Sequence, residues 1–360
     1  MDITKIDKNF ANTFSYEGMK VYDVNEEPFK LYGLCREDGE TDYKRLPADF
    51  AQSLGNPSVA VMYNRTTGIR VRFKTDSNRI ILKCVQKEQV NIPHIAVTCS
   101  SCFDLYADGQ YCNVFRPGID TNGKFSEDKS MDGGYQSGYV FKGERKMREL
   151  LIHFPLYNSV DQVFIALEED AQLLPPEEYG HTGPVVFYGS SITQGACASH
   201  PGNCYVNILS RRLDFDFVNL GFSGGCFAEP EFARYIPGLK PSVLVLDYDH
   251  NSSLAQLKER HEPFFKEFRK HCPDVPVVFV TMADLSAGVE GRKNRRNTIY
   301  KTYENAVAAG DKNVYFIDGG EMYQEPGVGA CTVDNAHPND LGFWFMAQKL
   351  IPLIKTILNQ

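Results

Sequence analysis

The first half of the chain alternates apolar and polar side chains with a period of two. In residues 69–74 (IRVRFK), for example, every second side chain is basic, as in a strand with one buried face. Runs that predict short strands occupy residues 69–74, 79–85, 103–111, 150–157 and 162–167. Asp108-Gly109 is a hairpin-turn signal, and helical periodicity is nearly absent. The pattern predicts an antiparallel, jelly-roll-like β-sandwich over residues 1–178.

After residue 183 the pattern changes to continuous apolar, β-branched runs separated by amphipathic segments. The runs that predict buried strands occupy residues 185–188, 215–220, 243–246, 275–280 and 314–318. Helical spacing is found over residues 254–268, 296–309 and 341–358. Strands alternating with helices predict a parallel sheet covered on both faces, and hence an α/β domain over residues 179–360. The acidic stretch 168–183, with its Pro-Pro pair, is the predicted linker.

Composition and charge narrow the classes of function. The net charge of −8 leaves no basic surface to neutralise phosphates, which argues against nucleic acid and against an anionic membrane surface as partners. The first eight residues carry charges where a signal peptide needs an apolar core, and no apolar run approaches the roughly 20 residues that span a bilayer. We therefore expect a cytoplasmic protein without a membrane partner.

The chain has ten cysteines, spread along its length. Cys99 and Cys102 form a C-x-x-C pair with Cys112 nearby, a possible zinc motif. A matching second pair is missing, so the favoured interpretation is free thiols packed as small hydrophobic groups, with no metal.

Four polar loops follow the predicted parallel strands, and ligands of such sheets bind beyond the carboxyl ends of the strands. The first loop carries Ser190 and Ser191, and the last carries Asp334 and His337 at a spacing that lets the carboxylate orient the imidazole. A serine becomes a nucleophile when such a base accepts its proton. Residues 221–225 (GFSGG) and Asn251 could donate hydrogen bonds to an oxyanion.

Alternatives remain for each of these residues. Ser191 could be only a helix N-cap, and His200 is a rival base or substrate contact, although it lies in a turn without a carboxylate. We interpret His250 as loop surface, and Phe343 and Trp344 as core of the final helix.

The order of these loops resembles the SGNH (GDSL-type) hydrolases, in which four blocks supply Ser, Gly, Asn and His. "GSSIT" resembles the first block and implies Ser191 as nucleophile; "NLGFSGG" resembles the second and implies an oxyanion hole formed by Ser191 and Gly224. "DNAHP" resembles the last block and implies His337 as base and Asp334 as its orienting carboxylate. The third block, G-x-N-D, is replaced here by DYDHN, and Asn251 is assigned as the third oxyanion donor from its place after the strand.

The string "CFDLY" at residues 102–106 is similar to the G-x-D-L-Y stretch in the β-rich N-terminal domain of a subgroup of these hydrolases, with Cys in place of Gly. The resemblance implies a flavodoxin-like three-layer catalytic domain that needs no cofactor. Relatives built from a β-sandwich and this domain commonly act on acetylated sugars.

The expected function is therefore a serine esterase that removes short acyl groups, above all acetyl, from carbohydrates such as mannan- or xylan-derived oligosaccharides through an acyl-enzyme. Two alternatives stay open. The same Ser-His-Asp site could serve an acyltransferase, lipase or thioesterase, and an inactive hydrolase half would leave a glycan-binding module. The sequence leaves open the sugar, the acyl length, the oligomeric state and whether the sandwich contacts the substrate.

Overall fold

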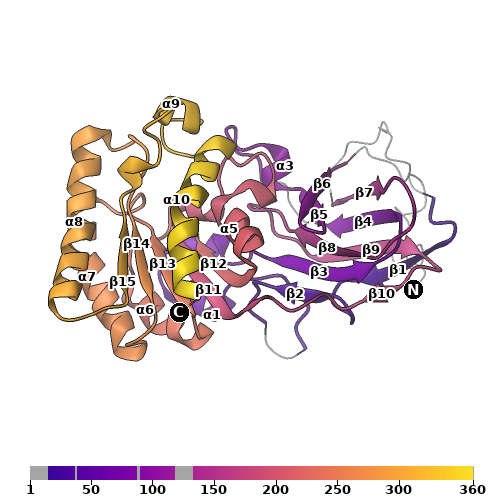
Figure 1. Cartoon of the computed structure of the whole chain (residues 1–360), viewed down its shortest axis with the longest axis horizontal. Coiled ribbons are helices and arrows are strands. Elements are labelled where there is room, and N and C mark those ends of the chain that lie inside the picture. The colour runs from indigo at the N-terminus through magenta and orange to yellow at the C-terminus, as the bar shows by residue number, and fades with distance from the viewer. Residues whose placement is uncertain (1–14, 37–38, 87–89, 118–132, 360) are drawn as a thin grey trace.

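The computed structural model describes residues 15–36, 39–86, 90–117 and 133–359. Figure 1 shows a β-rich part next to an α/β part, with the N-terminal half of the chain in the first and the C-terminal half in the second. The first eight residues, on which the expectation of a cytoplasmic location rests, lie outside the described residues.

The β-rich part consists of two antiparallel sheets. One has the strand order β1 (Met19–Asp23), β9 (Gln162–Glu168), β4 (Arg79–Val85), β7 (Tyr135–Val140). The other has the order β10 (Leu173–Leu174), β3 (Arg70–Thr75), β8 (Arg148–His153), β5 (Phe103–Ala107), β6 (Gln110–Phe115), and β2 (Lys30–Tyr32) also pairs with β3. The predicted sandwich is confirmed.

A tight hairpin turn and a core shared by the two sheets stabilise this sandwich. Asp108 (φ 50°) and Gly109 (φ 75°) both adopt the left-handed backbone that a two-residue hairpin turn requires. Side chains from the two sheets, such as Phe73, Leu82 and Ile165, meet in one buried core.

The α/β part contains one parallel sheet. Its strand order is β12 (Phe215–Gly221), β11 (His181–Gly189), β13 (Val243–Asp247), β14 (Val277–Val280), β15 (Val314–Ile317). Because β11 comes first in the chain and lies second in the sheet, the order is the flavodoxin-like 2-1-3-4-5, as expected.

Alternate residues of the strands face opposite layers of helices, which explains their continuous apolar sequence. On β11, Val185 and Phe187 face one buried cluster, whereas Val186 and Tyr188 face the other. The first cluster contains residues of α5 (Tyr205–Leu213), α9 (Val328–Cys331) and α10 (Asp340–Leu358), and the second contains residues of α6 (Pro230–Tyr235), α7 (Leu254–His271) and α8 (Gly288–Ala308).

Helix α7 starts with a capping box, in which Ser253 and Gln256 exchange side-chain and backbone hydrogen bonds, and it continues through Pro263. On its inner face, His261 is 2 % exposed and its Nδ1 lies 2.9 Å from the Thr302 hydroxyl of α8. Burial disfavours the charged imidazole and lowers the pKa of His261 to about 4. This histidine is therefore a neutral core residue.

Helix α10 is, by length and composition, the one helix of the described residues that could cross a membrane, with a mean hydropathy of 1.3. Its apolar side chains Phe343, Met346, Leu350 and Ile354 are buried in the α/β core, so the same composition suits a core helix. Phe343 is core as expected, but Trp344 is 38 % exposed and lies under the Arg212 guanidinium.

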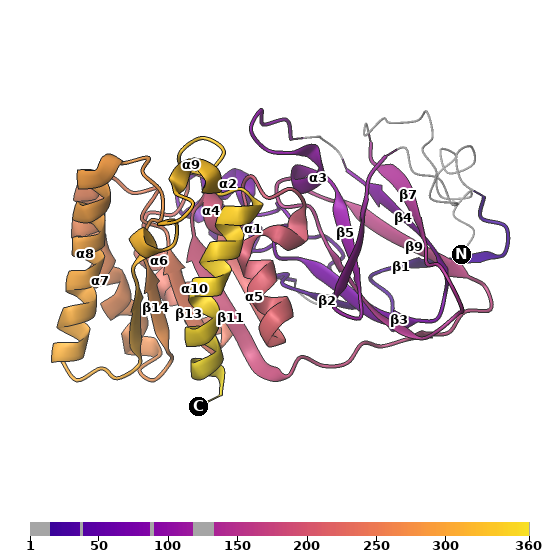
Figure 2. The same cartoon turned by 45° about the horizontal axis from the view of Figure 1, so that its top comes forward.

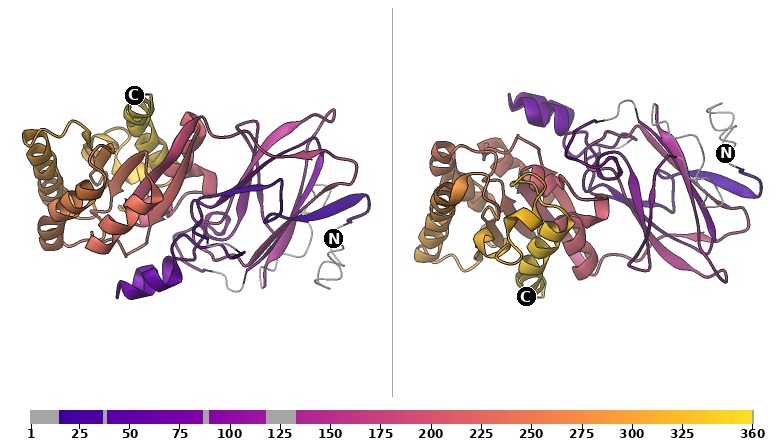
Figure 3. Two further views of the ribbon diagram at one scale, coloured as in Figure 1. Left: turned by 90° about the horizontal axis from the view of Figure 1, so that it is seen from below. Right: turned by 90° about the horizontal axis from the view of Figure 1, so that it is seen from above.

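The first half contains helices that the sequence did not predict: α1 (Ala48–Ser53), α2 (Pro57–Met62) and α3 (Val97–Ser100). Both views of Figure 3 show the purple helical segment of α1 and α2 extending from the sandwich alongside the α/β part. Phe50 of α1 stacks on Tyr235, with ring centroids 4.5 Å apart, and packs edge-on against Phe232. β10 ends and β11 begins on either side of the predicted boundary at 178/179. Residues 45–65 of the first half nevertheless pack on the α/β part, whereas Tyr43 lies in the sandwich core.

Candidate active site

The chain turns sharply between β11 and the short helix α4 (Ser191–Gln194), and glycine is required at that corner. A Cβ on Gly189 would lie 1.9 Å from the Thr193 hydroxyl and 2.5 Å from the carbonyl oxygen of Asp247. Only the absence of a side chain lets the strand end so close to its neighbour. Ser191 is placed at the first position of α4, 8 % exposed.

Ser190, and not Ser191, is the N-cap of α4. The Ser190 side chain accepts a hydrogen bond from the backbone N–H of Ile192 at 3.2 Å. Beneath it, Asp247 accepts hydrogen bonds from the hydroxyls of Thr193 and Tyr205, each at 3.0 Å. Burial raises the pKa of Asp247 to about 7. These contacts hold the N-terminus of α4 in place and do not use the Ser191 hydroxyl, which can bond to another residue.

That partner is His337. The Ser191 Oγ and His337 Nε2 atoms lie 2.9 Å apart, although the two residues are 146 positions apart in the sequence. The other ring nitrogen, Nδ1, lies 2.7 Å from Oδ2 of Asp334. With Nδ1 protonated toward the carboxylate, Nε2 offers its lone pair to the serine proton. The structure therefore brings together the three residues that the sequence proposed as nucleophile, base and orienter.

A tight loop before α10 presents Asp334 and His337 to each other. The backbone N–H of Val333 donates to the carbonyl of His337 at 2.9 Å, and Asn335 takes a left-handed φ of 67° at the tip. Oδ1 of Asp334 accepts the backbone N–H of His337 at 2.8 Å. Burial opposes ionisation of Asp334, but the hydrogen bonds from the His337 backbone and side chain outweigh it and lower the pKa of Asp334. This carboxylate is ionised and oriented at neutral pH.

The residues proposed as oxyanion donors lie on loops beside Ser191. Gly224 follows β12 with a left-handed φ of 68°, and within the described residues neither its N–H nor that of Ser191 donates a hydrogen bond. Asn251 donates one side-chain N–H to the carbonyl of Phe222 at 3.1 Å and has a second N–H to offer. The Ser191 and Gly224 N–H groups and the second amide N–H of Asn251 are therefore available as donors, as the proposed oxyanion role requires.

The loop that carries Gly224 is held by residues that the sequence analysis did not single out. The Gln194 side chain accepts the N–H of Ser223 at 2.9 Å, and the Asn56 side chain donates to the carbonyl of Gly225 at 2.7 Å. Arg45 is 1 % exposed and donates to the carbonyls of Asn219 and Gly221 at 2.9 and 2.8 Å. Because Arg45 and Asn56 belong to the first half of the chain, that half shapes the site.

Arg45 is unusual because its buried charge faces carbonyl groups in place of a carboxylate. Besides Asn219 and Gly221, it donates to the carbonyls of Met62 and Arg65 at 2.8 and 2.7 Å. Its guanidinium lies 4.4 Å from the centre of the Phe222 ring, and burial lowers the pKa of Arg45 to about 9. No motif marks such a residue, since its partners are backbone atoms.

A second set of contacts joins the halves at Asp104, the aspartate of the "CFDLY" stretch. Its fully buried carboxylate lies 2.7 Å from Nδ1 of His153 and 2.6 Å from Nδ1 of His200, and it accepts the N–H of Gly202. Burial opposes ionisation of Asp104, but both imidazoles lower its pKa, and burial lowers the pKa of His153 to about 4. The expectation that His200 lacks a carboxylate partner is wrong, because the partner comes from the sandwich, and this pairing argues against His200 as the base.

The interpretation of His250 as loop surface is also wrong. Its Nε2 lies 2.6 Å from Asp284 and its Nδ1 lies 3.2 Å from Asp249, and despite burial these two carboxylates raise its pKa. His250 therefore lies, largely enclosed, between two carboxylates that favour its charged form.

Two groups of side chains within the described residues are close enough to share a metal ion: Asp247, Asp249 and His250 in one, and His94, Cys197 and His337 in the other. In the first group, Nε2 of His250 is already hydrogen-bonded to Asp284 outside the group, whereas Nδ1 lies 3.2 Å from Asp249 without hydrogen-bond geometry. The zinc alternative that involved Cys99, Cys102 and Cys112 corresponds to neither group in the described part of the chain.

Comparison with known families agrees with this geometry. Residues 182–355 match the GDSL-like lipase/acylhydrolase family, and residues 19–173 match the family described as the N-terminus of SGNH-hydrolase-type esterases, named GxDLY. The chain therefore belongs to the SGNH (GDSL-type) hydrolases. More particularly, it is an SGNH-type esterase that combines this catalytic domain with the GxDLY-type sandwich. No curated protein matches the chain at a significant level.

Three solved structures share the fold over most of the chain. The protein described as a GDSL-like lipase from Bacteroides ovatus has a TM-score of 0.82 and 27% identity, covering 95% of this chain and 98% of that one. A salicylyl-acyltransferase from a tetracycline biosynthetic pathway has a TM-score of 0.76 and 17% identity, covering 94% and 98%. An acetyl xylan esterase from the rumen bacterium Butyrivibrio proteoclasticus has a TM-score of 0.57 and 13% identity, covering 95% and 99%.

Proposed function

We propose that this protein is a serine esterase that removes short acyl groups, in particular acetyl, from O-acetylated carbohydrates such as mannan- or xylan-derived oligosaccharides. The observation that carries the proposal is the hydrogen-bonded series Ser191–His337–Asp334, with distances of 2.9 and 2.7 Å, beside two backbone N–H groups that have no other acceptor in the described part of the chain. The acetyl xylan esterase among the similar folds supports the substrate class.

In the first half of the reaction, the Ser191 oxygen attacks the ester carbonyl carbon while Nε2 of His337 takes the hydroxyl proton. Negative charge develops on the carbonyl oxygen, which the N–H groups of Ser191 and Gly224 and the Asn251 amide stabilise. The ester C–O bond then breaks, and the sugar leaves as an alcohol with the proton from His337. The acetyl group remains bonded to Ser191.

In the second half, a water molecule attacks the acyl-enzyme and gives its proton to His337. The second tetrahedral intermediate collapses, acetate leaves, and His337 returns the proton to Ser191. Asp334 stays ionised throughout and keeps Nδ1–H directed toward itself, so the imidazole holds one orientation as base and as acid.

The proposal is tested with 4-nitrophenyl acetate and octanoate as substrates for the wild type and Ser191→Ala. We expect turnover of acetate that the variant loses by at least about 10³-fold, because no other hydroxyl replaces the nucleophile. Ser190→Ala is the matched control: it removes the helix cap and leaves the Ser191 hydroxyl, so it should affect stability more than kcat. Equal turnover by wild type and Ser191→Ala would refute the role of Ser191.

The acyl group and the sugar need separate measurements. Preference for octanoate over acetate would contradict the acetyl proposal. Time-resolved NMR of acetylated mannan and xylan oligomers would then identify the sugar and the hydroxyl position that the enzyme releases.

The second candidate is an acyltransferase, lipase or thioesterase with the same three residues. The TM-scores of the GDSL-like lipase and the salicylyl-acyltransferase to this chain, 0.82 and 0.76, are higher than the 0.57 of the acetyl xylan esterase. This order supports the second candidate function. Adding alcohol acceptors to the assay separates the two: an esterase gives acetate as the product, whereas a transferase gives the acylated acceptor.

A further inference from the structure

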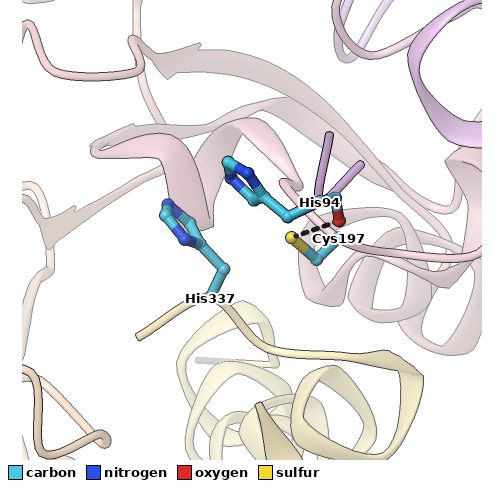
Figure 4. Close-up of side chains that lie close together, drawn as sticks. All are labelled: His94, Cys197 and His337. Atoms are coloured by element: carbon cyan, nitrogen blue, oxygen red, sulfur yellow. Dashed lines mark hydrogen bonds between the residues drawn. The ribbon is translucent and has the colours of Figure 1, made fainter. Parts of the chain in front are cut away.

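A histidine, a cysteine and a second histidine from three distant segments meet at the rim of the candidate active site. His94 precedes α3 in the first half of the chain, Cys197 follows α4, and His337 lies between α9 and α10. Figure 2 shows α3, α4 and α9 along the upper edge of the molecule, and the close-up in Figure 4 shows the three side chains together. One ligand atom from each lies within 4.8 Å of the other two.

The arrangement of these side chains suits one small ion. The two imidazole rings lie with centroids 5.1 Å apart and an interplanar angle of 34°. The Cys197 thiol donates a hydrogen bond to the carbonyl oxygen of His94 at 3.3 Å, a bond that is given up when the thiol loses its proton to bind an ion. Ligand atoms around tetrahedral zinc are about 3.3–3.6 Å apart, given Zn–N and Zn–S bonds of about 2.0–2.3 Å. Binding of one ion therefore requires the side chains to rotate toward each other, and the exposed His94 is the least constrained by packing.

The types of ligand atom, nitrogen and sulfur, determine which ions this cluster can bind. Two imidazoles and a thiolate favour Zn²⁺, Co²⁺ or copper, whereas Mg²⁺ and Ca²⁺ require oxygen ligands. Cys197 has a left-handed φ of 73°, an uncommon conformation for a residue other than glycine, which places its buried side chain beside His94.

Asp334 already completes the outer shell of such a site. Histidines that bind zinc usually donate their second ring N–H to a carboxylate, which fixes the tautomer. The hydrogen bond from His337 Nδ1 to Asp334 does this and leaves the lone pair of Nε2, which faces Ser191, as the available donor atom of the ring. The same orientation therefore suits a proton acceptor and a metal ligand.

We propose that His94, Cys197 and His337 bind a single Zn²⁺ ion, and that this ion reversibly inhibits the enzyme. When the ion binds, the Cys197 thiol releases its proton to solvent and a Zn–S bond forms. The lone pair of His337 Nε2 forms a Zn–N bond, so it no longer accepts the proton of Ser191. The fourth position is left to water. The inhibitory part rests on the proposed function, whereas the binding part does not.

Two measurements test the site, one of activity and one of binding. Zn²⁺ is titrated into the ester assay of wild type, His94→Gln and Cys197→Ser, each normalised to its own activity without metal. We expect inhibition that EDTA reverses, with a half-inhibitory concentration at least about tenfold higher in each variant. Mg²⁺ and Ca²⁺ should not inhibit. Binding is followed with Co²⁺, through the thiolate-to-cobalt charge-transfer absorption that Cys197→Ser should abolish.

The controls separate failure of the site from failure of the proposed function. His271→Gln and Cys112→Ser change an exposed histidine and a half-buried cysteine outside the cluster and should respond to Zn²⁺ as wild type does. Ser191→Ala should bind Co²⁺ with its absorption unchanged even though it hydrolyses nothing. Cobalt binding without ester hydrolysis in wild type would refute the esterase but support the site. Equal zinc inhibition in wild type and both cluster variants, or no charge-transfer band in wild type, would refute the site.

Discussion

Replacing His261 by glutamine should remove a measurable part of the protein's sensitivity to acid. His261 is buried between α7 and α8 and bonded to Thr302, and its pKa is lowered to about 4 from the ordinary value of 6.5. Below pH 6.5 the unfolded chain binds a proton at this residue and the folded chain does not. Protonation therefore favours unfolding, and the contribution of neutral His261 to the free energy of unfolding is lost as the pH falls from 6.5 toward 4.

The two pKa values set the size of the effect. At 1.36 kcal/mol per pH unit, the full interval between 6.5 and 4 corresponds to roughly 3.4 kcal/mol. Between pH 7 and pH 5, the linkage relation gives a loss of about 2 kcal/mol in the free energy of unfolding. His261→Gln keeps a hydrogen-bonding group opposite Thr302 but has no proton to gain, so this contribution is absent from the variant.

The assay is urea unfolding of wild type and His261→Gln at pH 7, 6 and 5, followed by circular dichroism. Other buried groups, such as Asp247, titrate in both proteins and cancel in the difference. His271→Gln, an exposed histidine of the same helix, is the matched control and should follow wild type. If the free energies of wild type and His261→Gln fall in parallel between pH 7 and 5, the buried imidazole does not carry this linkage.

Three further substitutions probe the site and its supports. Arg45→Met removes the side-chain donor of four backbone carbonyls, three of them buried, and should lower the free energy of unfolding by at least about 3 kcal/mol in urea titrations, with a loss of kcat; an unchanged unfolding midpoint would contradict this. Asp104→Ala removes the acceptor of three buried donors and should destabilise by about 3–5 kcal/mol in thermal unfolding, whereas Asp104→Asn keeps one acceptor and should do less; equal losses would argue against this role for the carboxylate. Asp334→Asn presents an amide to His337 Nδ1 and should lower kcat by roughly 10²–10⁴-fold with little change in KM, and a kcat within twofold of wild type would exclude the orienting role.

Sequence patterns predicted the two folds because their signals are local. A strand with one buried face alternates, a strand buried on both faces does not, and both patterns can be read without knowing what packs against them. Ser191, Asp334 and His337 could be found for a related reason, since each lies in a short motif after a predicted strand. Their approach to within hydrogen-bonding distance follows from the common edge at which parallel strands end.

The supports of the site could not be predicted in this way, because their partners are distant in sequence. Arg45 binds carbonyl groups up to 176 positions away, and its own neighbours show no pattern. The carboxylate partner of His200 was missed, and the interpretation of His250 as loop surface was wrong, because Asp104 and Asp284 lie 96 and 34 positions away from these histidines. Such pairs are visible only when the whole chain is folded.

The contacts of Arg45 and Asn56 with the β12 loop limit how this protein can be recombined with its relatives. A chimera joined at residue 178 would pair the glycine loop of one parent with the guanidinium and amide of another, and any difference in loop length would leave those groups without acceptors. Exchanging residues 45–65 together with the hydrolase half keeps the partners of Arg45 and Asn56 matched, so the useful crossover points lie on both sides of that segment and not at the linker alone.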